Sequence, residues 1–494
     1  MKQYFVGVDL GSSNVVMVVG SRAEGSDSIN IEGISVQSTK KSIKQGRICT
    51  SLSSAVPNLS SAILAAKHEL EEELGIKIEQ GYFGLGDSNT RCVIVEDMLP
   101  VKNKKTGVIG NEDITILRHM MRQIKTESCA EGVWEISPLC YFVNGTKQTL
   151  DPVGMQGSWL KGRYMLTVGM NDQINSLKQM HHKLGIEIQN IFVTPLITYP
   201  LLVSKSEAQK GVVVVDMGSE VTDVTIIRDG KVQYFYSLPV GAELIDSDLK
   251  SILAKGSNVT KIKHLYGESM SCNVADNEII KDGNKEIIRR NIATVIEARV
   301  MDIAELVGKV IDESGLSAFL DGGIVLTGGC SSLKGIDSLF ERELNRPCRK
   351  ADVLYGVGSK PSECEITPGQ HAAVAIMLHA SQYQSSYVRE LDQIDFVGSD
   401  QEGIVEPAPV TPVIPVIPVT EPADETIDIT GGGQTPDSEA DTATDNHSAD
   451  VDGNGKDQGN APVKKQPTKK NSKGVISKLF GNLSRFMGGD EKEK

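Results

Sequence analysis

Cysteine is scarce in this chain, and its few copies are scattered. Eight cysteines occur in 494 residues, and no two of them form a Cys-x-x-Cys pair. Secreted disulfide scaffolds and structural zinc sites both need closely spaced cysteines. The eight histidines are also spread out, and only His181 and His182 are adjacent. We therefore expect reduced thiols, and the sequence predicts no metal cluster of cysteine and histidine.

Long hydrophobic runs are absent as well. No stretch approaches the roughly 18 apolar residues that a membrane-spanning helix needs. The apolar start at 4–8 is broken by Asp9, and no signal-peptide cleavage site follows. Any membrane contact is therefore expected to be peripheral. Acidic residues also outnumber basic ones, which gives a net charge of −14. This charge argues against a general nucleic-acid binder, which needs a basic surface.

Charge is unevenly distributed near the C-terminus. Residues 401–463 contain 13 Asp and Glu but one basic residue, Lys456, whereas 464–494 contain nine Lys and Arg and three acids. A proline-rich stretch at 407–423 favours extended polyproline II. The acidic part that follows it has almost nothing to bury. We predict a disordered Pro-rich and acidic linker over 399–472 that leads into a basic tail.

The first 400 residues alternate between strand-like and helix-like stretches, which predicts an α/β fold. Strand-like residues occupy 4–20 and 211–218, and 53–75 has a helical pattern. One internal similarity is informative, because 8–14 (VDLGSSN) resembles 215–221 (VDMGSEV). Each segment places Asp at the end of an apolar strand, before a Gly/Ser turn and a second strand. A unit repeated about one domain apart suggests a duplicated fold with one ligand between its halves.

The chemistry of these turns suits phosphate. Glycine and serine leave backbone N–H groups free to converge on an anion. A neighbouring Asp can hold a divalent cation through water, and two such turns facing each other would clamp a polyphosphate. A third segment, 322–331 (GGIVLTGGCS), reads as a strand and a Gly-Gly turn, which allows close approach of a flat ring or a sugar. Neither a GxGxxG nor a GxxxxGKS/T motif is present, so Rossmann and P-loop folds are not favoured.

The three segments resemble the ATPase superfamily that includes actin, Hsp70 and the sugar kinases. Within it, the chain resembles the bacterial FtsA family over residues 1–395. Two further stretches, 261–267 (KIKHLYG) and 295–307 (VIEARVMDIAELV), look specific to that family. The resemblance implies an actin-like, duplicated ribonuclease-H-type fold with two lobes and a 1C subdomain of FtsA type. The implied subdomain bounds are 1–82, 163–196 and 355–395 for 1A, 83–162 for 1C, 197–240 and 301–354 for 2A, and 241–300 for 2B.

The resemblance also implies a site for ATP and Mg²⁺. Asp9 and Asp216 take the metal-associated roles. The implied nucleotide-binding residues are Gly11, Ser12, Ser13, Asn14, Asp216, Gly218, Ser219, Gly241, Lys263, Gly328 and Gly329. Lys263 is a candidate contact to the base or ribose, and a solvated helix lysine is the alternative. No catalytic residue is assigned.

Two departures from the family pattern bear on hydrolysis. The second turn reads Gly218-Ser219-Glu220 where many relatives have GGG or GGT, and Glu220 adds negative charge if it points inward. Relatives that hydrolyse ATP well carry Gln or Glu near Val193 or Thr194, where it orients the attacking water. We therefore expect a site that binds ATP, with at most weak ATPase activity.

The basic tail contains an amphipathic stretch at 473–489. At 100° per residue its apolar residues fall within an arc of about 140°, and polar or basic residues fill the rest. The predicted membrane-contacting residues are Val475, Ile476, Lys478, Leu479, Phe480, Leu483, Arg485, Phe486 and Met487. A basic amphipathic helix beyond a long linker is typical of an interfacial membrane anchor. A groove on a partner protein is the alternative.

The resemblance implies a structural adaptor more than an enzyme. Such a protein polymerises as a peripheral protein on the cytoplasmic face of the inner membrane, at the division site. Its partners would be further copies of itself, transmembrane division proteins, an anionic membrane surface and the C-terminal peptide of the tubulin-like FtsZ, held in subdomain 2B. Through that peptide it would anchor the FtsZ ring, and no nucleic acid is expected. The alternatives are a sugar-kinase-type enzyme, which would need a catalytic Asp and a sugar cleft, and a pilus-assembly actin-like ATPase.

Overall fold

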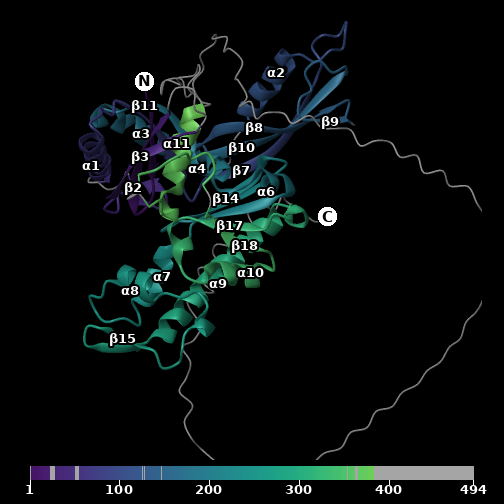
Figure 1. The fold of residues 1–494 in the computed structure, drawn as a ribbon. Coiled ribbons are helices and arrows are strands. Elements are labelled where there is room, and N and C mark those ends of the chain that lie inside the picture. Colours follow the sequence, from purple (N-terminus) through teal and green to yellow (C-terminus); the bar gives the residue numbers. More distant parts are fainter. Residues whose placement is uncertain are drawn as a thin grey trace, which may run out of the picture. The chain divides into compact units, whose positions relative to one another are not determined.

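The computed structural model describes residues 2–22, 28–49, 55–124, 126, 128–145, 147–352, 354–361 and 365–382. All of these residues belong to one compact unit, which Figure 1 shows. The predicted linker and the predicted amphipathic helix lie outside the described residues. Among the residues that are described, no helix is both long and apolar enough to cross a lipid bilayer.

The N-terminal half of the fold is built on a five-stranded sheet with the order β11-β6-β1-β2-β3. Its strands are β1 (Gln3–Leu10), β2 (Asn14–Arg22), β3 (Asn30–Ser38), β6 (Gln80–Leu85) and β11 (Glu187–Val193). β1 pairs antiparallel with β2 and parallel with β6, and β6 pairs parallel with β11. The carboxyl ends of β1, β6 and β11 therefore meet at one edge of the sheet, which is where ligands bind in sheets of this kind.

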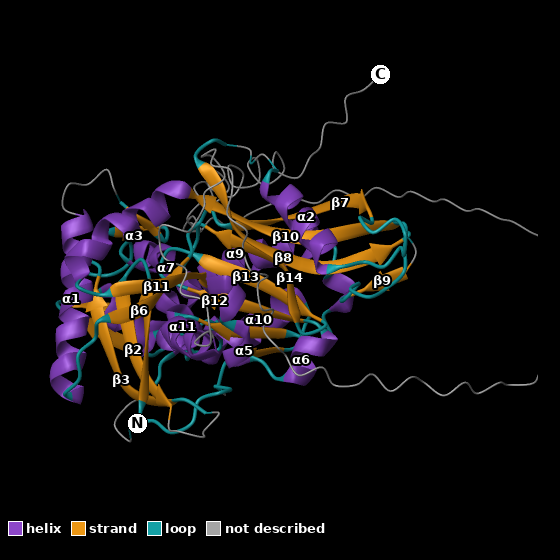
Figure 2. Cartoon of the chain, turned by 90° about the horizontal axis from the view of Figure 1, so that it is seen from above, coloured by secondary structure: helices purple, strands orange, loops and turns teal. Residues whose placement is uncertain are grey.

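Helices cover both faces of this sheet, as Figure 2 shows. Helices α1 (Ala55–Leu74) and α3 (Asn171–Leu184) pack on one face, and α11 (His371–Gln382) packs on the other. Because side chains alternate along a strand, β1 sends Val8 toward the first face and Phe5 toward the second. A Cβ atom at Gly7 would lie 2.6 Å from the main chain of α11, so glycine is needed there for the helix to approach.

The second sheet has nine strands in the order β18-β17-β12-β13-β14-β7-β10-β8-β9. The strands from the C-terminal half are β12 (Val212–Met217), β13 (Thr222–Arg228), β14 (Lys231–Leu238), β17 (Ile324–Thr327) and β18 (Cys348–Lys350). The other four are β7 (Arg91–Pro100), β8 (Glu131–Val143), β9 (Lys147–Thr149) and β10 (Trp159–Met170), which we call the strand module. One register pair, Arg91 with Tyr236, joins this module to β14.

The two sheets contain the same structural unit. In the first, hairpin β1–β2 pairs through β1 with the parallel strand β6. In the second, hairpin β12–β13 pairs through β12 with the parallel strand β17. The sequence repeat thus marks two equivalent hairpins of a duplicated α/β fold. We call the half built on the five-stranded sheet lobe 1 and the half built on β12, β13, β14, β17 and β18 lobe 2.

The remaining elements connect or extend these lobes. Residues 241–300 form a small region of α7 (Ala242–Leu249), α8 (Val259–Tyr266), β15 (Ile279–Asp282), β16 (Lys285–Ile288) and the start of α9 (Arg289–Glu313). The other elements are β4 (Ile43–Lys44), β5 (Arg47–Ile48), α2 (Asn111–Arg122), α4 (Thr194–Ile197), α5 (Tyr199–Leu202), α6 (Lys205–Lys210) and α10 (Ile336–Leu344), with short 3-10 helices at Ser271–Asn273, Ser317–Phe319, Gly329–Ser332 and Pro368–Gln370. Buried residues recur every three or four positions along α9, which is the period of a helix with one face in the core.

Candidate functional site

The two repeated turns have the same hydrogen-bonded shape. In the first, the N–H of Gly11 donates to the carbonyl oxygen of Asn14 over 3.0 Å, and in the second, the N–H of Gly218 donates to that of Val221 over 2.9 Å. A Cβ atom at either glycine would lie 3.0 Å from that same carbonyl oxygen. Neither turn therefore has room for a larger residue without a shift of the main chain. An aspartate precedes each turn near the end of its strand.

Three carboxylates from the two lobes interact at this site. They are Asp9 of lobe 1 and Asp216 and Asp223 of lobe 2, and burial is the main cause that raises the pKa of each to about 7. The second cause is repulsion by a neighbouring carboxylate, since Asp223 acts on Asp9, Asp9 on Asp216 and Asp216 on Asp223. The two repeated turns therefore face one another across a single site, which concentrates negative charge and suits a cation.

Sequence reasoning misses Asp223, which reads as an isolated polar residue at the start of an apolar strand. In the β12–β13 ladder it pairs directly with Asp216. Its carboxylate also accepts a hydrogen bond from the hydroxyl group of Ser237 over 2.5 Å. Directly paired residues of antiparallel strands send their side chains to the same face of the sheet. The signal is therefore present in the sequence, because the tight turn between the two aspartates fixes their register.

The predicted adenosine turn lies directly behind Asp216. Gly328 follows β17 with φ +81°, and a Cβ atom there would lie 2.3 Å from the Oδ1 atom of Asp216. Gly329, by contrast, has open space around its Cα atom. Thr327 Oγ1 and His371 Nδ1, 2.8 Å apart, link the end of β17 to α11 of lobe 1. Burial lowers the pKa of His371 to about 4, so this inter-lobe contact, which the sequence does not reveal, involves a neutral ring.

Lys263 and Gly241 approach the site from the region 241–300. Lys263 is buried, and its ammonium group lies 2.6 Å from the carboxylate of Asp246. Burial raises the pKa of Cys330, which follows Gly329 in the predicted adenosine turn, and the positive charge of Lys263 opposes this rise. Lys263 therefore lies near that turn. A Cβ atom at Gly241 would lie 2.6 Å from the carbonyl oxygen of Ser219, so α7 begins in contact with the second repeated turn. Lys263 is thus enclosed by protein and is not a solvated helix lysine.

A small hairpin, β4–β5, lies against both repeated turns. Its tip consists of Gln45 and Gly46, with φ values of +50° and +76°. The N–H of Gly46 donates to Ser12 Oγ over 3.0 Å, and the N–H of Gln45 donates to the carboxylate of Glu220. Glu220 therefore points away from its own turn and reaches lobe 1. On the other side of the first turn, the hydroxyl group of Thr39 donates to the carbonyl oxygens of Ser12 and Ser13, at 2.7 and 3.1 Å.

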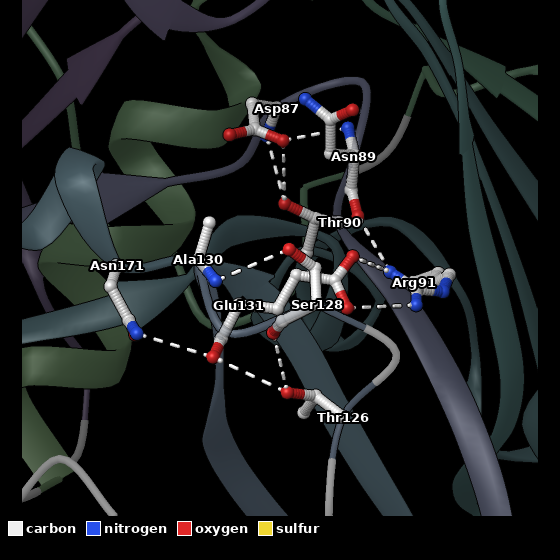
Figure 3. A network of polar contacts seen from close by, with 9 residues as sticks. All are labelled: Asp87, Asn89, Thr90, Arg91, Thr126, Ser128, Ala130, Glu131 and Asn171. Atoms are coloured by element: carbon white, nitrogen blue, oxygen red, sulfur yellow. Dashed lines mark hydrogen bonds and ion pairs between the residues drawn. The ribbon is translucent and has the colours of Figure 1, made fainter. Parts of the chain in front are cut away.

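A polar network beside the site holds the strand module in place, as Figure 3 shows. Arg91 at the start of β7 donates to both carboxylate oxygens of Glu131, at 2.8 and 3.2 Å, and the two side chains are only 8% and 10% exposed. The amide of Asn171 at the start of α3 donates to the carbonyl oxygen of Glu131 over 3.2 Å. Asp87, in the turn before β7, accepts from the N–H of Asn89 over 2.6 Å and contributes to the raised pKa of Asp223. The network thus connects the module to the edge of the candidate site.

The segment predicted to lie where related enzymes orient the attacking water carries no Gln or Glu at Val193 or Thr194. Val193 ends β11 and Thr194 begins α4, and both are buried. The hydroxyl group of Thr225 on β13 donates to the carbonyl oxygen of Pro195 over 3.3 Å, so this segment contacts the second hairpin. Neither Val193 nor Thr194 can accept a proton from water as a carboxylate does.

Two hollows lie away from the facing turns. One, of about 200 Å³, is lined by Arg91, Ile124 and neighbouring residues of the strand module. The other, of about 340 Å³, lies between that module and lobe 2 and is lined by Leu139, Arg228 and Lys231 among others. In the described part of the chain, no group of three or more His, Cys, Asp or Glu side chains is arranged to hold a metal ion.

Comparisons with known proteins agree with these motifs. Residues 213–369 match the model of the family described as cell division protein FtsA. The chain is 27% identical to the cell division protein FtsA of Streptococcus pneumoniae over 346 residues, which cover 68% of this chain and 73% of that protein. It is 24% identical to the FtsA of Borreliella burgdorferi over 394 residues, which cover 78% of this chain and 92% of that protein.

A solved structure supports the fold. The chain resembles a chain of the PilM-PilN type IV pilus biogenesis complex with a TM-score of 0.55 and 14% sequence identity. That likeness covers 76% of this chain and 98% of the other. At this identity it bears on the fold alone. The predicted actin-like, two-lobed fold is therefore confirmed, and this chain resembles the FtsA cell division proteins in sequence.

Proposed function

We propose that this chain binds ATP with Mg²⁺ between the two repeated turns and acts as an actin-like adaptor in bacterial cell division. The observation that carries the proposal is the contact of one hairpin tip, at Gln45 and Gly46, with both repeated turns, which brings Asp9 and Asp216 of the two lobes to one site. The repeat in sequence, the identical turn hydrogen bonds and the likeness to curated cell division proteins support the same conclusion.

Each predicted residue has a role in this proposal. Gly11, Ser12, Ser13 and Asn14 form the turn on the β-phosphate side, and Gly218 and Ser219 form the turn on the γ-phosphate side. Gly328 and Gly329 leave space for the adenosine, with Lys263 and Gly241 beside them. Bound Mg²⁺ would neutralise part of the phosphate charge, and Asp9 and Asp216 would hold its water ligands. Because these carboxylates have raised pKa values without a cation, binding of Mg²⁺ should favour their ionised forms.

Calorimetric titration of the full chain with MgATP tests this site. In the double variant Gly11→Val, Gly218→Val, a side chain would clash with the carbonyl oxygen that closes each turn. We expect the affinity for MgATP to fall at least about tenfold, the effect of losing 1.4 kcal/mol of binding free energy. Gly110→Val is the matched control, because the nearest atom to its Cβ would be 4.0 Å away and its φ is ordinary. Unchanged affinity in a double variant that keeps its thermal stability would refute the assignment.

We also propose that hydrolysis is slow, so that the nucleotide acts on assembly more than on turnover. Val193 and Thr194 replace the amide or acid that would orient the attacking water. A nucleotide that remains bound for long can keep the two lobes in one relative position, which suits a polymer subunit. A sugar kinase would instead need a catalytic Asp next to a sugar cleft.

The proposed cellular role requires three kinds of contact. Further copies of the chain would form the polymer, and the C-terminal peptide of FtsZ would bind subdomain 2B, proposed as 241–300. The predicted helix at 473–489 would attach the polymer to the cytoplasmic face of the inner membrane at the division site, where transmembrane division proteins are recruited. We propose these assignments from the family resemblance and from the charge pattern of the sequence. A pilus-assembly role is the alternative, and it would leave the amphipathic helix unexplained.

Exposed apolar residues support a peptide site in 241–300. Ile279 and Ile288 pair across the β15–β16 hairpin, and both are exposed, as is Leu265 near the end of α8. Arg289 joins these elements, because its Nε donates to the carbonyl oxygen of Tyr266 over 3.0 Å and its Nη1 pairs with Glu278 over 3.0 Å. The end of α8 therefore lies beside the hairpin. Exposed apolar residues gathered in this way are typical of a protein-binding surface.

A further inference from the structure

Glu220 extends from the second phosphate turn to the opposite lobe. Its carboxylate accepts a hydrogen bond from the main-chain N–H of Gln45, at the tip of the β4–β5 hairpin. The next residue, Gly46, donates its N–H to Ser12 Oγ in the first phosphate turn over 3.0 Å. Adjacent N–H groups of one hairpin tip therefore contact both phosphate turns. The Glu220 carboxylate thus contacts a residue whose neighbour in the chain contacts the first turn.

The hairpin tip cannot easily move away from Glu220. A Cβ atom at Gly46 would lie 2.5 Å from the carbonyl oxygen of Gly86 and 2.7 Å from the Cα atom of Asp87, so the tip packs directly on the turn before the strand module. The N–H of Ser88 donates to the carbonyl oxygen of Gln45 over 3.0 Å. The N–H that Glu220 contacts is therefore fixed in position, and displacing the contact requires the half-buried Glu220 side chain to move.

The Glu220 carboxylate already accepts a hydrogen bond from an N–H group that lies between the two turns. A carboxylate and a phosphate accept hydrogen bonds from the same donors, so they compete for the same N–H group. Three further carboxylates, Asp9, Asp216 and Asp223, already raise the local negative charge. The terminal phosphate of a nucleoside triphosphate would add charge in this space, whereas a nucleoside diphosphate lacks that group.

We propose that Glu220 determines the preference of this site between nucleoside triphosphate and diphosphate. The third phosphate of a triphosphate either displaces the Glu220 carboxylate from the Gln45 N–H or is repelled by it. A diphosphate lacks that phosphate and meets neither cost. The inference rests on the proposed nucleotide site and adds to it a residue that weakens binding of the third phosphate. It also gives a physical role to the residue by which the second turn departs from GGG or GGT.

The test compares the dissociation constants of MgATP and MgADP by calorimetry in the full chain. Glu220→Gln removes the charge and keeps the shape, and Glu220→Ala removes both. We expect each variant to bind MgATP about tenfold more tightly than wild type, the effect of one charge-assisted contact. The affinity for MgADP should stay within about twofold. Glu243→Gln is the matched control, because Glu243 is an exposed acid in the first turn of α7, close to the second phosphate turn but on its own lobe.

The outcomes separate this inference from the proposed function. If MgATP and MgADP bind to every variant with the wild-type ratio of affinities, nucleotide binding is upheld and the role of Glu220 is refuted. Weaker binding of MgATP to Glu220→Gln would also refute it, because Glu220 would then assist the triphosphate. An equal gain in MgATP affinity in Glu243→Gln would also refute it, because the effect would then come from the overall negative charge and not from the position of Glu220. If no nucleotide binds to wild type or to any variant, the nucleotide site itself is refuted, and the inference fails with it.

Discussion

At the scale of single residues, the carboxylates of the site make the stability of the nucleotide-free protein depend on pH. Asp9, Asp216 and Asp223 have pKa values raised to about 7, from an ordinary value of 3.8. Between about pH 4 and pH 7 the folded state therefore holds more protons than the unfolded state. By linkage, the free energy of unfolding falls as pH rises through this range and levels off above it. Burial of mutually repelling charges is the physical cause.

The variant Asp223→Asn should reduce this loss. It removes one charge from the cluster, and the amide oxygen can still accept the hydrogen bond from Ser237. We expect the variant to be more stable than wild type by about 1 kcal/mol at pH 7.5 and by little at pH 5, where the carboxylate is largely protonated. Urea unfolding of nucleotide-free protein at the two pH values measures both numbers.

Asp282→Asn provides a control of opposite sign. Hydrogen bonds from Ser257 and from the N–H of Ala254 hold the pKa of Asp282 below its ordinary value. Its charge therefore contributes stability above the unfolded pKa, and the variant should be less stable at pH 7.5. Equal pH profiles for Asp223→Asn and wild type would show that the three carboxylates do not titrate as a group.

Sequence patterns identify some of these residues and not others. Asp9 and Asp216 can be predicted because each ends one copy of a repeated segment. Asp87 and His371 cannot, since each acts through a tertiary contact with a distant part of the chain. Nor does the sequence reveal that Glu220 bonds to Gln45, because 175 residues separate the two partners. Each of these contacts depends on how distant parts of the chain come together in the fold, which no local sequence pattern encodes.

At the scale of elements, local patterns predict the strands of the repeated segments and one helix beside them. The helix predicted at 53–75 is α1, described from Ala55 to Leu74, and the strand predicted at 211–218 is β12, from Val212 to Met217. The strand-like stretch 4–20 is two strands, because the turn at 11–13 folds β2 back onto β1. The position of the strand module beside β14 depends on one register pair, so no local pattern can predict it.

The β15–β16 hairpin gives a test at this scale. Ile279→Glu places a charge in the exposed apolar surface formed with Ile288 and Leu265. Because Ile279 is exposed, the fold should be unaffected. We expect binding of a labelled FtsZ C-terminal peptide, followed by fluorescence anisotropy, to weaken by at least about tenfold while MgATP affinity is unchanged.

Lys281→Ala is the matched control for this hairpin. Lys281 is an exposed residue of the same strand, two positions along, and its removal leaves the apolar pair intact. Peptide binding that is equally strong in wild type and in Ile279→Glu would place the FtsZ site elsewhere. If Lys281→Ala alone weakened binding, charge and not apolar contact would hold the peptide.

At the scale of the whole molecule, the charge pattern of the sequence separates the proposed nucleotide-binding body from the predicted membrane-binding tail. The predicted linker of 399–472 would span roughly 45–50 Å as a random coil, and more if its acidic residues repel one another. A flexible linker of this kind transmits little strain, so ATP binding and membrane binding should be independent in a monomer. They become linked through assembly, because a polymer presents many weak anchors to one surface.

The predicted anchor can be tested at one apolar position. Burial of Phe480, Leu483 and Phe486 in a lipid surface is worth up to about 1.5–3 kcal/mol for each side chain. Basic residues near an anionic surface add about 1 kcal/mol each, reduced by salt. Folding a short helix consumes much of this gain, so a single anchor should bind reversibly. Phe480→Glu should therefore release the protein from anionic vesicles in a flotation assay and leave its affinity for MgATP unchanged.

Asn482→Glu distinguishes loss of apolar burial from the added charge, because Asn482 lies on the predicted polar side of the same helix. It introduces the same charge and should weaken flotation less than Phe480→Glu does. Higher salt should release a variant that cannot polymerise more readily than the wild type, since many anchors hold a polymer at once. Two results would show that the tail is not a membrane anchor and that the helix binds a groove on a partner protein. One is that Phe480→Glu protein still floats with vesicles, and the other is that neutral and anionic vesicles bind the wild type equally.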